Sequence, residues 1–423
     1  MALIEALFGD RAGILRTRQF QLLLFANVNG ALGLVLVSPF LEVLTGPFAV
    51  SDVRIGLLMT AYTVPPVVGI PLVGMLADRY GRKPLLVAGL LVFGLAGAAV
   101  SMTTDFTVAL VLRILQGIGY AGTVPVIIAA IGDLYTGPTE ATAQGLRFTS
   151  SGLTHTVFPV IAGILVGFAW QYPFLLYLLA VPIAIAIALF FEETRTSTDT
   201  ETTVSDGGST RSRGAYVRQI AALSAQPKMA AILVALAVPS FLHVGFITYV
   251  SFLVVRVLGG TPGIAGLLLS VVSVIYAIAA SQAGRLTDWL GSRAIPLLAA
   301  NVCIGVGLST VALAPALPVA VIGVAIMGLG VGLDFSLLRS VLTSIAPESH
   351  RGGIVGLGES LIRLFNSAAP VVIGWLFAVL TAPLGEATAI RYGLTIVAVI
   401  GAAIGIGAIL VARASPAPGP VAT

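Results

Sequence analysis

Long apolar runs separated by short polar breaks dominate this sequence. Read against those breaks, the runs predict twelve helices long enough to cross a bilayer, which takes ~20 residues. The first six are expected over 20–44, 53–77, 84–103, 106–132, 142–169 and 172–191. The second six are expected over 229–255, 263–286, 294–313, 317–345, 353–380 and 390–411. The pattern therefore predicts an all-α membrane protein that crosses the lipid bilayer many times.

One polar stretch, between the sixth and seventh runs, is much longer than the others. Residues 192–214 are rich in Ser, Thr and charged side chains and have no apolar periodicity, which is typical of a flexible linker. After it, Val217, Ile220 and Leu223 have the spacing of a short helix with one apolar face, which could lie along the membrane surface. We expect three parts: a six-helix bundle over 1–191, the linker with its short helix over 192–227, and a second bundle with a short disordered tail over 228–423.

The two halves of the chain resemble each other at a nearly constant offset. The segment GMLADRYGRK at 74–83 matches GRLTDWLGSR at 284–293, 210 residues later. Glycine or proline also recurs 211 residues on in the pairs Gly117 and Gly328, Gly119 and Gly330, Gly145 and Gly356, Pro159 and Pro370, and Gly163 and Gly374. Because six spans return the chain to the side where it entered, the repeat is parallel. The predicted fold is twelve transmembrane helices in two pseudo-symmetric six-helix bundles, an architecture that recurs in transporters.

Composition agrees with a membrane protein and argues against a soluble domain. Hydrophobic residues make up 57% of the chain and charged residues only 9%, whereas a soluble domain carries ~25% charged residues. The net charge of +4 arises from few charges, so it indicates no nucleic-acid partner. The first apolar run is too long for the core of a cleavable signal, so we expect it to stay in the membrane.

Lysine and arginine are distributed unequally between the two sides of the predicted spans. Of the 22 such residues, sixteen, Arg147 among them, fall on the side of the amino terminus. The opposite side holds Arg54, Arg256 and Arg391, and the spans themselves hold Arg113, Arg339 and Arg363. Because cytoplasmic loops carry the excess of positive charge, both termini are expected in the cytoplasm of a cell-membrane protein.

The loop between the second and third spans, GMLADRYGRKP, resembles the signature loop of the major facilitator superfamily of transporters. The matching residues are Gly74, Leu76, Ala77, Asp78, Arg79, Gly81, Arg82 and Lys83. The weaker copy in the second half keeps Gly284, Asp288, Gly291 and Arg293. The resemblance covers essentially the whole chain, and it implies a small-molecule transporter that works by alternating access. Gly74 is expected to let the second helix approach a neighbour closely, and Gly81 to permit a tight turn.

The resemblance also implies that this loop takes part in a conformational latch on the cytoplasmic side. Asp78 is expected to lie at the amino terminus of the eleventh helix, near 351–353, where the helix dipole favours an anion. Arg82 is expected to pair with Asp133 at the end of the fourth helix. An alternative remains open, in which these charges only set topology and solvate the loop.

The fourth span, with Arg113, Gln116, Gly117 and Gly119, resembles a second motif of the family that is associated with proton-linked members. An arginine inside a span costs ~2.5–3.5 kcal/mol, so Arg113 should face a cavity or a partner. The alternative is a side chain that extends to the outer surface. The same glycines, with Gly122, have the GxGxxG spacing of a dinucleotide fold, but within a span they are expected to pack helices closely.

A third family pattern, that of the drug–proton antiporters in the fifth span, is matched only in part. Pro159 and Gly163 are kept, and the other positions of the pattern differ. The chain therefore resembles the antiporter branch without matching its signature fully.

Polar residues in the first and seventh spans are candidates for substrate binding or proton coupling, because these helices line the cavity in this family. Asn27 and Asn29 cannot share a helix face, so one is expected to reach the cavity and the other to make a packing hydrogen bond. His243 and Tyr249 lie in the seventh span, the repeat counterpart of the first.

The second half also contains charged residues within its spans. Asp334 is the most interior acid, and a carboxylate in a low-dielectric interior can act as a proton carrier. The alternative is a structural ion pair with a neighbouring helix, because Arg339 is poorly placed to neutralise it. Glu359 and Arg363, at i and i+4, are expected to pair along the eleventh span.

The sequence contains no enzyme constellation. The three histidines, at 155, 243 and 350, occur singly, and neither HExxH nor a GxxxxGK loop is present. We therefore expect no catalytic activity, cofactor or metal. Our leading hypothesis is a monomeric, proton-coupled exporter of an amphiphilic or drug-like compound. The alternatives are a facilitator or proton symporter that imports a small metabolite, and a membrane receptor or scaffold on the same fold.

Overall fold

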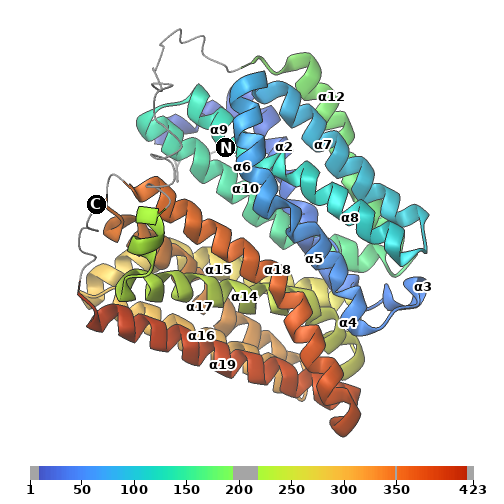
Figure 1. Ribbon diagram of the computed structural model, residues 1–423. Helices are drawn as coiled ribbons and strands as arrows, with labels where there is room; N and C mark the ends of the chain where they lie inside the picture. The colour runs from blue at the N-terminus through green and yellow to red at the C-terminus, as the bar shows by residue number, and fades with distance from the viewer. Residues whose placement is uncertain (1–8, 194–217, 348–349, 417–423) are drawn as a thin grey trace. The chain divides into compact units, whose positions relative to one another are not determined.

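The structure is a computed structural model that describes residues 9–193, 218–347 and 350–416 (Figure 1). Twelve helices within these ranges are long and apolar enough to cross a membrane, and the described residues contain no strand. The predicted all-α fold with twelve spans is therefore confirmed.

Several of the first six spans consist of more than one helical segment. Their bounds are Arg18–Phe40, Asp52–Tyr80, Arg82–Met102, Phe106–Leu134, Gly137–Leu165 and Tyr172–Phe190. The principal helices are α2 (Arg18–Val35), α4 (Asp52–Ile55), α5 (Leu57–Thr63), α6 (Pro65–Tyr80), α7 (Arg82–Ala99), α8 (Phe106–Ala121), α9 (Val124–Leu134), α10 (Gly137–Leu165), α11 (Tyr172–Leu175) and α12 (Ala180–Phe190). The second span breaks before Pro65 and the fourth before Pro125, because proline fits the first turn of a helix but not its interior.

The last six spans are more continuous. They are α14 (Pro227–Phe252) with a π-helical turn over Leu253–Val257, α15 (Pro262–Leu290), α16 (Ala294–Leu313), α17 (Leu317–Ile345), α18 (Arg351–Leu384) and α19 (Glu386–Ala414). The ninth and tenth spans have the predicted bounds. The fifth begins and ends several residues earlier than predicted, because Gly137 and Pro138 start the helix rather than precede it.

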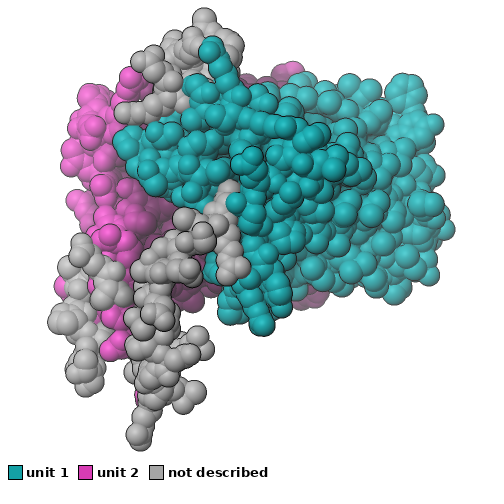
Figure 2. Space-filling view, turned by 90° about the horizontal axis from the view of Figure 1, so that it is seen from above, with its two compact units in different colours: residues 1–196, 247–270 teal, residues 197–246, 271–423 magenta. Residues whose placement is uncertain are grey.

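The described residues gather into two compact units, which are coloured separately in Figure 2. Unit 1 comprises 1–196 and 247–270, and unit 2 comprises 197–246 and 271–423. By its contacts, the segment that ends the seventh span and begins the eighth thus belongs with the first six spans. The sequence does not indicate this assignment, and the predicted three-part division stays a prediction.

Glycines of the internal repeat pack helices in the same way within each unit. Gly117 lies against the backbone of α5 and Gly119 against that of α7. Their counterparts Gly328 and Gly330 lie against the backbones of α15 and α16. A methyl group at any of the four would collide with a neighbouring helix. The expectation that these glycines pack helices is confirmed, and the sequence repeat corresponds to a repeat in packing.

A short helix over 218–224 precedes the seventh span, close to where the sequence predicts one. Leu223 is buried in the core of unit 2 with Met229 and Leu338. Val217 and most of the predicted linker lie outside the described residues.

Candidate functional site

The turn between α6 and α7 requires a residue without a side chain. Gly81 has φ +96°, a conformation that other residues adopt only at a cost. A Cβ atom there would also lie 2.7 Å from the carboxyl carbon of Glu193. Gly291, its repeat counterpart, has φ +59°. The predicted tight turn is confirmed.

The prediction that Gly74 lets the second helix approach a neighbouring helix closely is wrong in this structure. A methyl group at Gly74 or at Gly284 would meet nothing within 4 Å. No neighbouring backbone lies beside these positions, so neither glycine brings two helices together here.

Charged groups around the turn form a compact cluster in unit 1. Arg82 donates to Asp133 at 2.9 Å, the predicted pair, and to Asp78 at 2.7 Å. The carboxylate of Glu193 accepts the backbone N–H groups of Arg82, at 2.7 Å, and Lys83, at 3.1 Å, where the dipole of α7 favours an anion. Sequence reasoning missed Glu193, although an acid directly after the sixth span was a visible signal.

The remaining residues of the two loops make smaller contributions. Arg79 stacks on Tyr80 with 5.3 Å between guanidinium carbon and ring centroid. In the second copy Arg293 donates to Ser344 at 3.3 Å, and the backbone oxygen of Asp288 accepts from the N–H of Gly291. The predicted contact of Asp78 with the start of the eleventh span would join the two units and stays a prediction. The role of both loops in a conformational latch also stays a prediction.

Arg113 is completely buried in the fourth span, so the alternative of a side chain that extends outward is wrong. Its guanidinium donates to the backbone oxygens of Leu58, at 3.1 Å, and Gly33, at 3.2 Å. It also donates to Gln116 at 2.6 Å and to the hydroxyl of Tyr177 at 3.4 Å. The described residues supply no carboxylate to it. Neutral acceptors therefore surround this cation on all sides.

A second polar group joins the first span to the fifth. The Asn27 amide donates to Ser150, at 2.9 Å, to Ser151, at 2.8 Å, and to the backbone oxygen of Arg147. Arg147 is only 5% exposed and lies ten residues inside α10. Arg147 therefore lies inside a helix and not in a loop, as the predicted span 142–169 already implied, although it was counted with the cations on the side of the amino terminus.

Asn29, two residues after Asn27, hydrogen-bonds within its own helix. Its amide donates to the backbone oxygen of Phe25 at 3.1 Å, and its Oδ1 has no hydrogen-bond partner among the described residues. Both asparagines are 1% exposed. A packing hydrogen bond is present as expected, and the expectation that one of the two asparagines reaches the cavity stays a prediction.

Asp334 is fully buried in α17 and accepts one hydrogen bond. Its Oδ1 receives the Asn301 amide of α16 at 3.0 Å, whereas its Oδ2 has no partner among the described residues. The alternative of an ion pair with a neighbouring helix is therefore wrong here. Asn301 was missed in the sequence, where it is a single amide in an apolar run.

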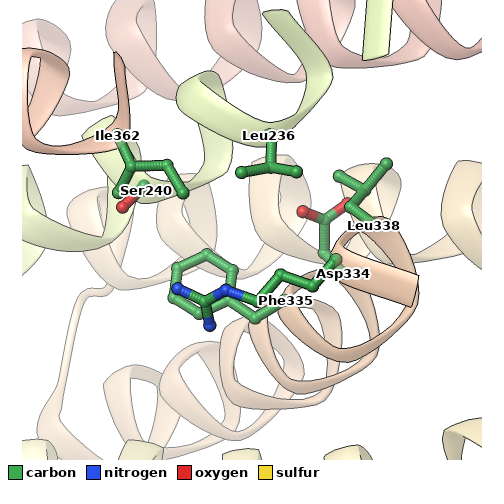
Figure 3. Close-up of a pocket in the computed structure, with 7 residues that line it drawn as sticks. Leu236, Ser240, Asp334, Phe335, Leu338 and Ile362 are labelled. Atoms are coloured by element: carbon green, nitrogen blue, oxygen red, sulfur yellow. The ribbon is translucent and has the colours of Figure 1, made fainter. Parts of the chain in front are cut away.

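A small cavity of about 20 Å³, enough for one water molecule, adjoins Asp334 within unit 2 (Figure 3). Its lining consists of Leu236, Ser240, Asp334, Phe335, Leu338, Arg339 and Ile362. Arg339 pairs with Glu359 of α18 at 2.9 Å. The predicted pair of Glu359 with Arg363 is therefore wrong, because the long Arg339 side chain reaches across from α17.

The two candidates in the seventh span lie in different surroundings. His243 meets Phe335 edge-on, with ring centroids 6.0 Å apart, in unit 2. Tyr249 is fully buried in unit 1 and packs on Phe252 at 5.6 Å. The structure does not bring them together at one site.

A cluster around Arg256, which sequence reasoning missed, holds the end of the seventh span to the first six. On the π-helical turn, Arg256 donates to Glu42 at 2.8 Å, to Asp52 at 2.7 Å and to Thr45 at 3.3 Å. The Ser251 hydroxyl accepts the backbone N–H of Glu42. The signal was present, since Arg256 is one of only three cations on its predicted side and both acids lie there too.

Comparison with known proteins places this arrangement in a family. The sequence model of the Major Facilitator Superfamily matches residues 23–261 and 241–423. Among solved structures, a bacterial homolog of the human lysosomal transporter Spinster, described as inward-facing and occupied, has a TM-score of 0.78 at 16% identity. The match covers 95% of this chain and 98% of that one, and at this identity it shows the fold alone.

Curated relatives match over shorter segments. The bacillibactin exporter of Bacillus subtilis (strain 168) is 33% identical over 150 residues, 34% of this chain and 37% of that protein. The multidrug transporter protein MdtP of the same organism is 36% identical over 118 residues, 28% of this chain and 22% of that protein. The matched segments thus span between about a fifth and little more than a third of these relatives. On the family match, the chain belongs to the Major Facilitator Superfamily, and its twelve apolar helices agree with a multi-pass membrane protein whose relatives are named as transporters.

Proposed function

We propose that this transporter exports an amphiphilic or drug-like solute in exchange for protons, by alternating access of its two six-helix halves. The observation that carries the proposal is Asp334, which is fully buried and has one oxygen without a hydrogen bond. An ionised carboxylate without a counter-cation is costly in such a place, whereas a protonated one is not. The group is thus suited to take up and release a proton as its access to water changes.

The lining of the small cavity beside Asp334 is mainly apolar, which supports a solute with an apolar part. Four of its seven lining residues are Leu236, Phe335, Leu338 and Ile362, which are apolar. Ser240 and the Arg339 side chain supply the remaining polar groups. The names of the relatives, an exporter and a multidrug transporter, support the outward direction.

We further propose that both termini lie in the cytoplasm of a cell-membrane protein that works as a monomer. The Arg82 cluster then lies on the cytoplasmic side, where it acts as part of a latch, and the Arg256 cluster lies on the outer side. Accessibility of single introduced cysteines at the two ends to an impermeant reagent in intact cells tests this orientation; labelling of the Arg82 side would overturn it.

Flux measurements in proteoliposomes with an imposed pH gradient test the transport proposal. With a panel of anionic, neutral and cationic aromatic probes, exchange requires at least one solute and protons to move in opposite directions. Movement in the same direction would favour the alternative of a proton symporter that imports a metabolite. Absence of any flux across the panel would favour the receptor alternative.

A pair of variants tests the role of Asp334 itself. We expect Asp334→Asn to lose proton-driven accumulation while it retains exchange of solute down its own gradient. Glu386→Gln, which neutralises an exposed acid in the first turn of α19, is the matched control and should behave as wild type. If Asp334→Asn still accumulates solute against a gradient, Asp334 does not carry the proton.

A further inference from the structure

The two buried arginines of unit 1 differ in how completely they are hydrogen-bonded. A guanidinium group has five N–H donors. Arg113 directs them at four oxygen acceptors and, at 4.0 Å, the sulfur of Met59. Arg147 makes two hydrogen bonds, one to Gln144 at 2.9 Å and a long one to Asn27 at 3.4 Å. Arg113 is saturated, and Arg147 is not.

The unsatisfied donors of Arg147 lie on one edge of its guanidinium group. Its Nε is occupied by Gln144, and its Nη1 makes the long bond to Asn27. Its Nη2 makes no hydrogen bond in the described structure, in which Arg147 also has no carboxylate partner. The edge formed by the two Nη atoms is the one that binds a carboxylate with two parallel hydrogen bonds.

The depth of Arg147 makes an uncompensated charge costly. The helix α10 has 29 residues, so it is roughly 43 Å long and exceeds the ~30 Å of hydrocarbon. Arg147 lies about 15 Å from its start, farther than the ~7 Å by which a centred helix would extend beyond hydrocarbon on each side. A neutral residue would cost less at this depth. Arg113 offsets the same cost with its four neutral acceptors, whereas Arg147 has only two, so an anion would offset the remainder.

The surroundings hold the side chain in place without neutralising it. Asn27 of the first span donates to the backbone oxygen of Arg147, and Gln144 of α10 accepts from its Nε. The ring of Phe148 lies 4.3 Å from the guanidinium carbon and covers one face. The cation is therefore positioned before any ligand arrives, which lowers the entropic cost of binding.

We propose that Arg147 binds a carboxylate group of the transported solute, and that the solutes of this transporter are amphiphilic monoanions. This inference rests on the proposed transport function and names its substrate class. Phe148, 62% exposed, is suited to contact the apolar part of the same molecule.

Binding of three probes with one skeleton tests the inference. The purified protein, in nanodiscs of neutral phosphatidylcholine that exclude anionic lipid, is titrated with 3-phenylpropionate, 3-phenylpropionamide and 3-phenylpropylamine. Wild type should bind the anion most tightly. Arg147→Gln should weaken binding of the anion roughly ten- to a hundredfold, the range of a charge-assisted hydrogen-bond pair, and leave binding of the amide unchanged. Arg147→Lys should recover part of the loss, and Arg413→Gln, an exposed arginine in the last turn of α19, should match wild type.

Equal binding of the three probes, binding of none, or an unchanged preference in Arg147→Gln would overturn the inference. No pH gradient is applied, so failure of proton coupling does not affect the result. Stability without ligand provides a second measurement. Arg113→Gln should lower the thermal stability more than Arg147→Gln, because it leaves four oxygen acceptors unpaired rather than two. An equal loss in both variants would show that Arg147 is structural and overturn the proposal.

Discussion

The Arg256 cluster allows a quantitative prediction about how segment 247–270 is held. Arg256→Gln removes two charge-assisted hydrogen bonds, to Glu42 and Asp52, and a third hydrogen bond to Thr45. The three charged side chains are between 15% and 25% exposed, so solvent screens them only in part. We therefore expect the segment to detach more readily from the rest of unit 1.

The magnitude follows from the exposure of these groups. A charge-assisted hydrogen bond contributes ~1.5–3 kcal/mol when buried, and exposed ion pairs contribute ~0.2–1 kcal/mol. For two partly buried bonds we expect a total loss of about 2–3 kcal/mol. The detached fraction should then rise roughly 30- to 150-fold.

Thiol labelling measures this fraction. Ser251→Cys, in a Cys303→Ala background, places a single thiol at a fully buried position of the segment. In detergent-solubilised protein, labelling by a maleimide should be slow and proportional to the detached fraction, so Arg256→Gln should accelerate it by the same factor. The double variant Glu42→Gln with Asp52→Asn should reproduce the effect.

The matched control is Arg391→Gln, which removes another arginine of the same predicted side. Arg391 donates to the backbone oxygens of Ala312 and Ala314 within unit 2. Its substitution should leave the labelling rate unchanged. A rise of less than about threefold in Arg256→Gln, or an equal rise in the control, would refute the reasoning.

Three further predictions concern stability, and thermal unfolding in detergent measures each. Gly323→Ala should lower the free energy of unfolding by about 1–3 kcal/mol, because its Cβ would lie 2.7 Å from the backbone nitrogen of Val311. The control Gly407→Ala should lower it by nothing, because a Cβ there meets nothing within 4 Å. Similar losses in both variants would contradict this reasoning. Glu193→Gln should lower stability by about 0.3–1 kcal/mol by weakening the charge at the start of α7, and an equal loss in Glu192→Gln would show that the capping position is irrelevant. Charge reversal at Arg339 or Glu359 alone should lower the free energy of unfolding by about 0.2–1 kcal/mol, as for an exposed ion pair, and reversal of both charges should restore it. An additive loss in the double variant would argue against the ion pair.

The spans could be predicted because each is a long apolar run with its own breakers. The ninth and tenth spans have the predicted ends, since Arg293 interrupts the apolar pattern before one and Pro315 with Pro318 mark the start of the other. The fifth span was displaced because its first turns are polar, TEATAQ, and polar turns of a helix that extends beyond the hydrocarbon cannot be told from a loop.

The partners of the charged residues could not be predicted in the same way. Asp334 is recognisable as an acid in a span, but its hydrogen-bond donor Asn301 lies 33 residues earlier on another helix. Glu359 has a suitable partner one turn away in Arg363, yet it pairs with Arg339, 20 residues earlier in the sequence. Only the packing of helices decides such choices, and a single sequence carries little information on it.

The boundary between the two units runs through the middle of two helices and not through loops. Contacts change from one unit to the other at 246–247 within α14 and at 270–271 within α15. A helix is stiff over such a length, so force applied at one end of either helix is delivered to the other end with little loss. A large motion of one unit would therefore either separate segment 247–270 from the rest of unit 1 or bend α14 and α15 near 246–247 and 270–271. We therefore predict that substitutions that make the seventh or eighth span more flexible near these points disturb transport without touching a ligand.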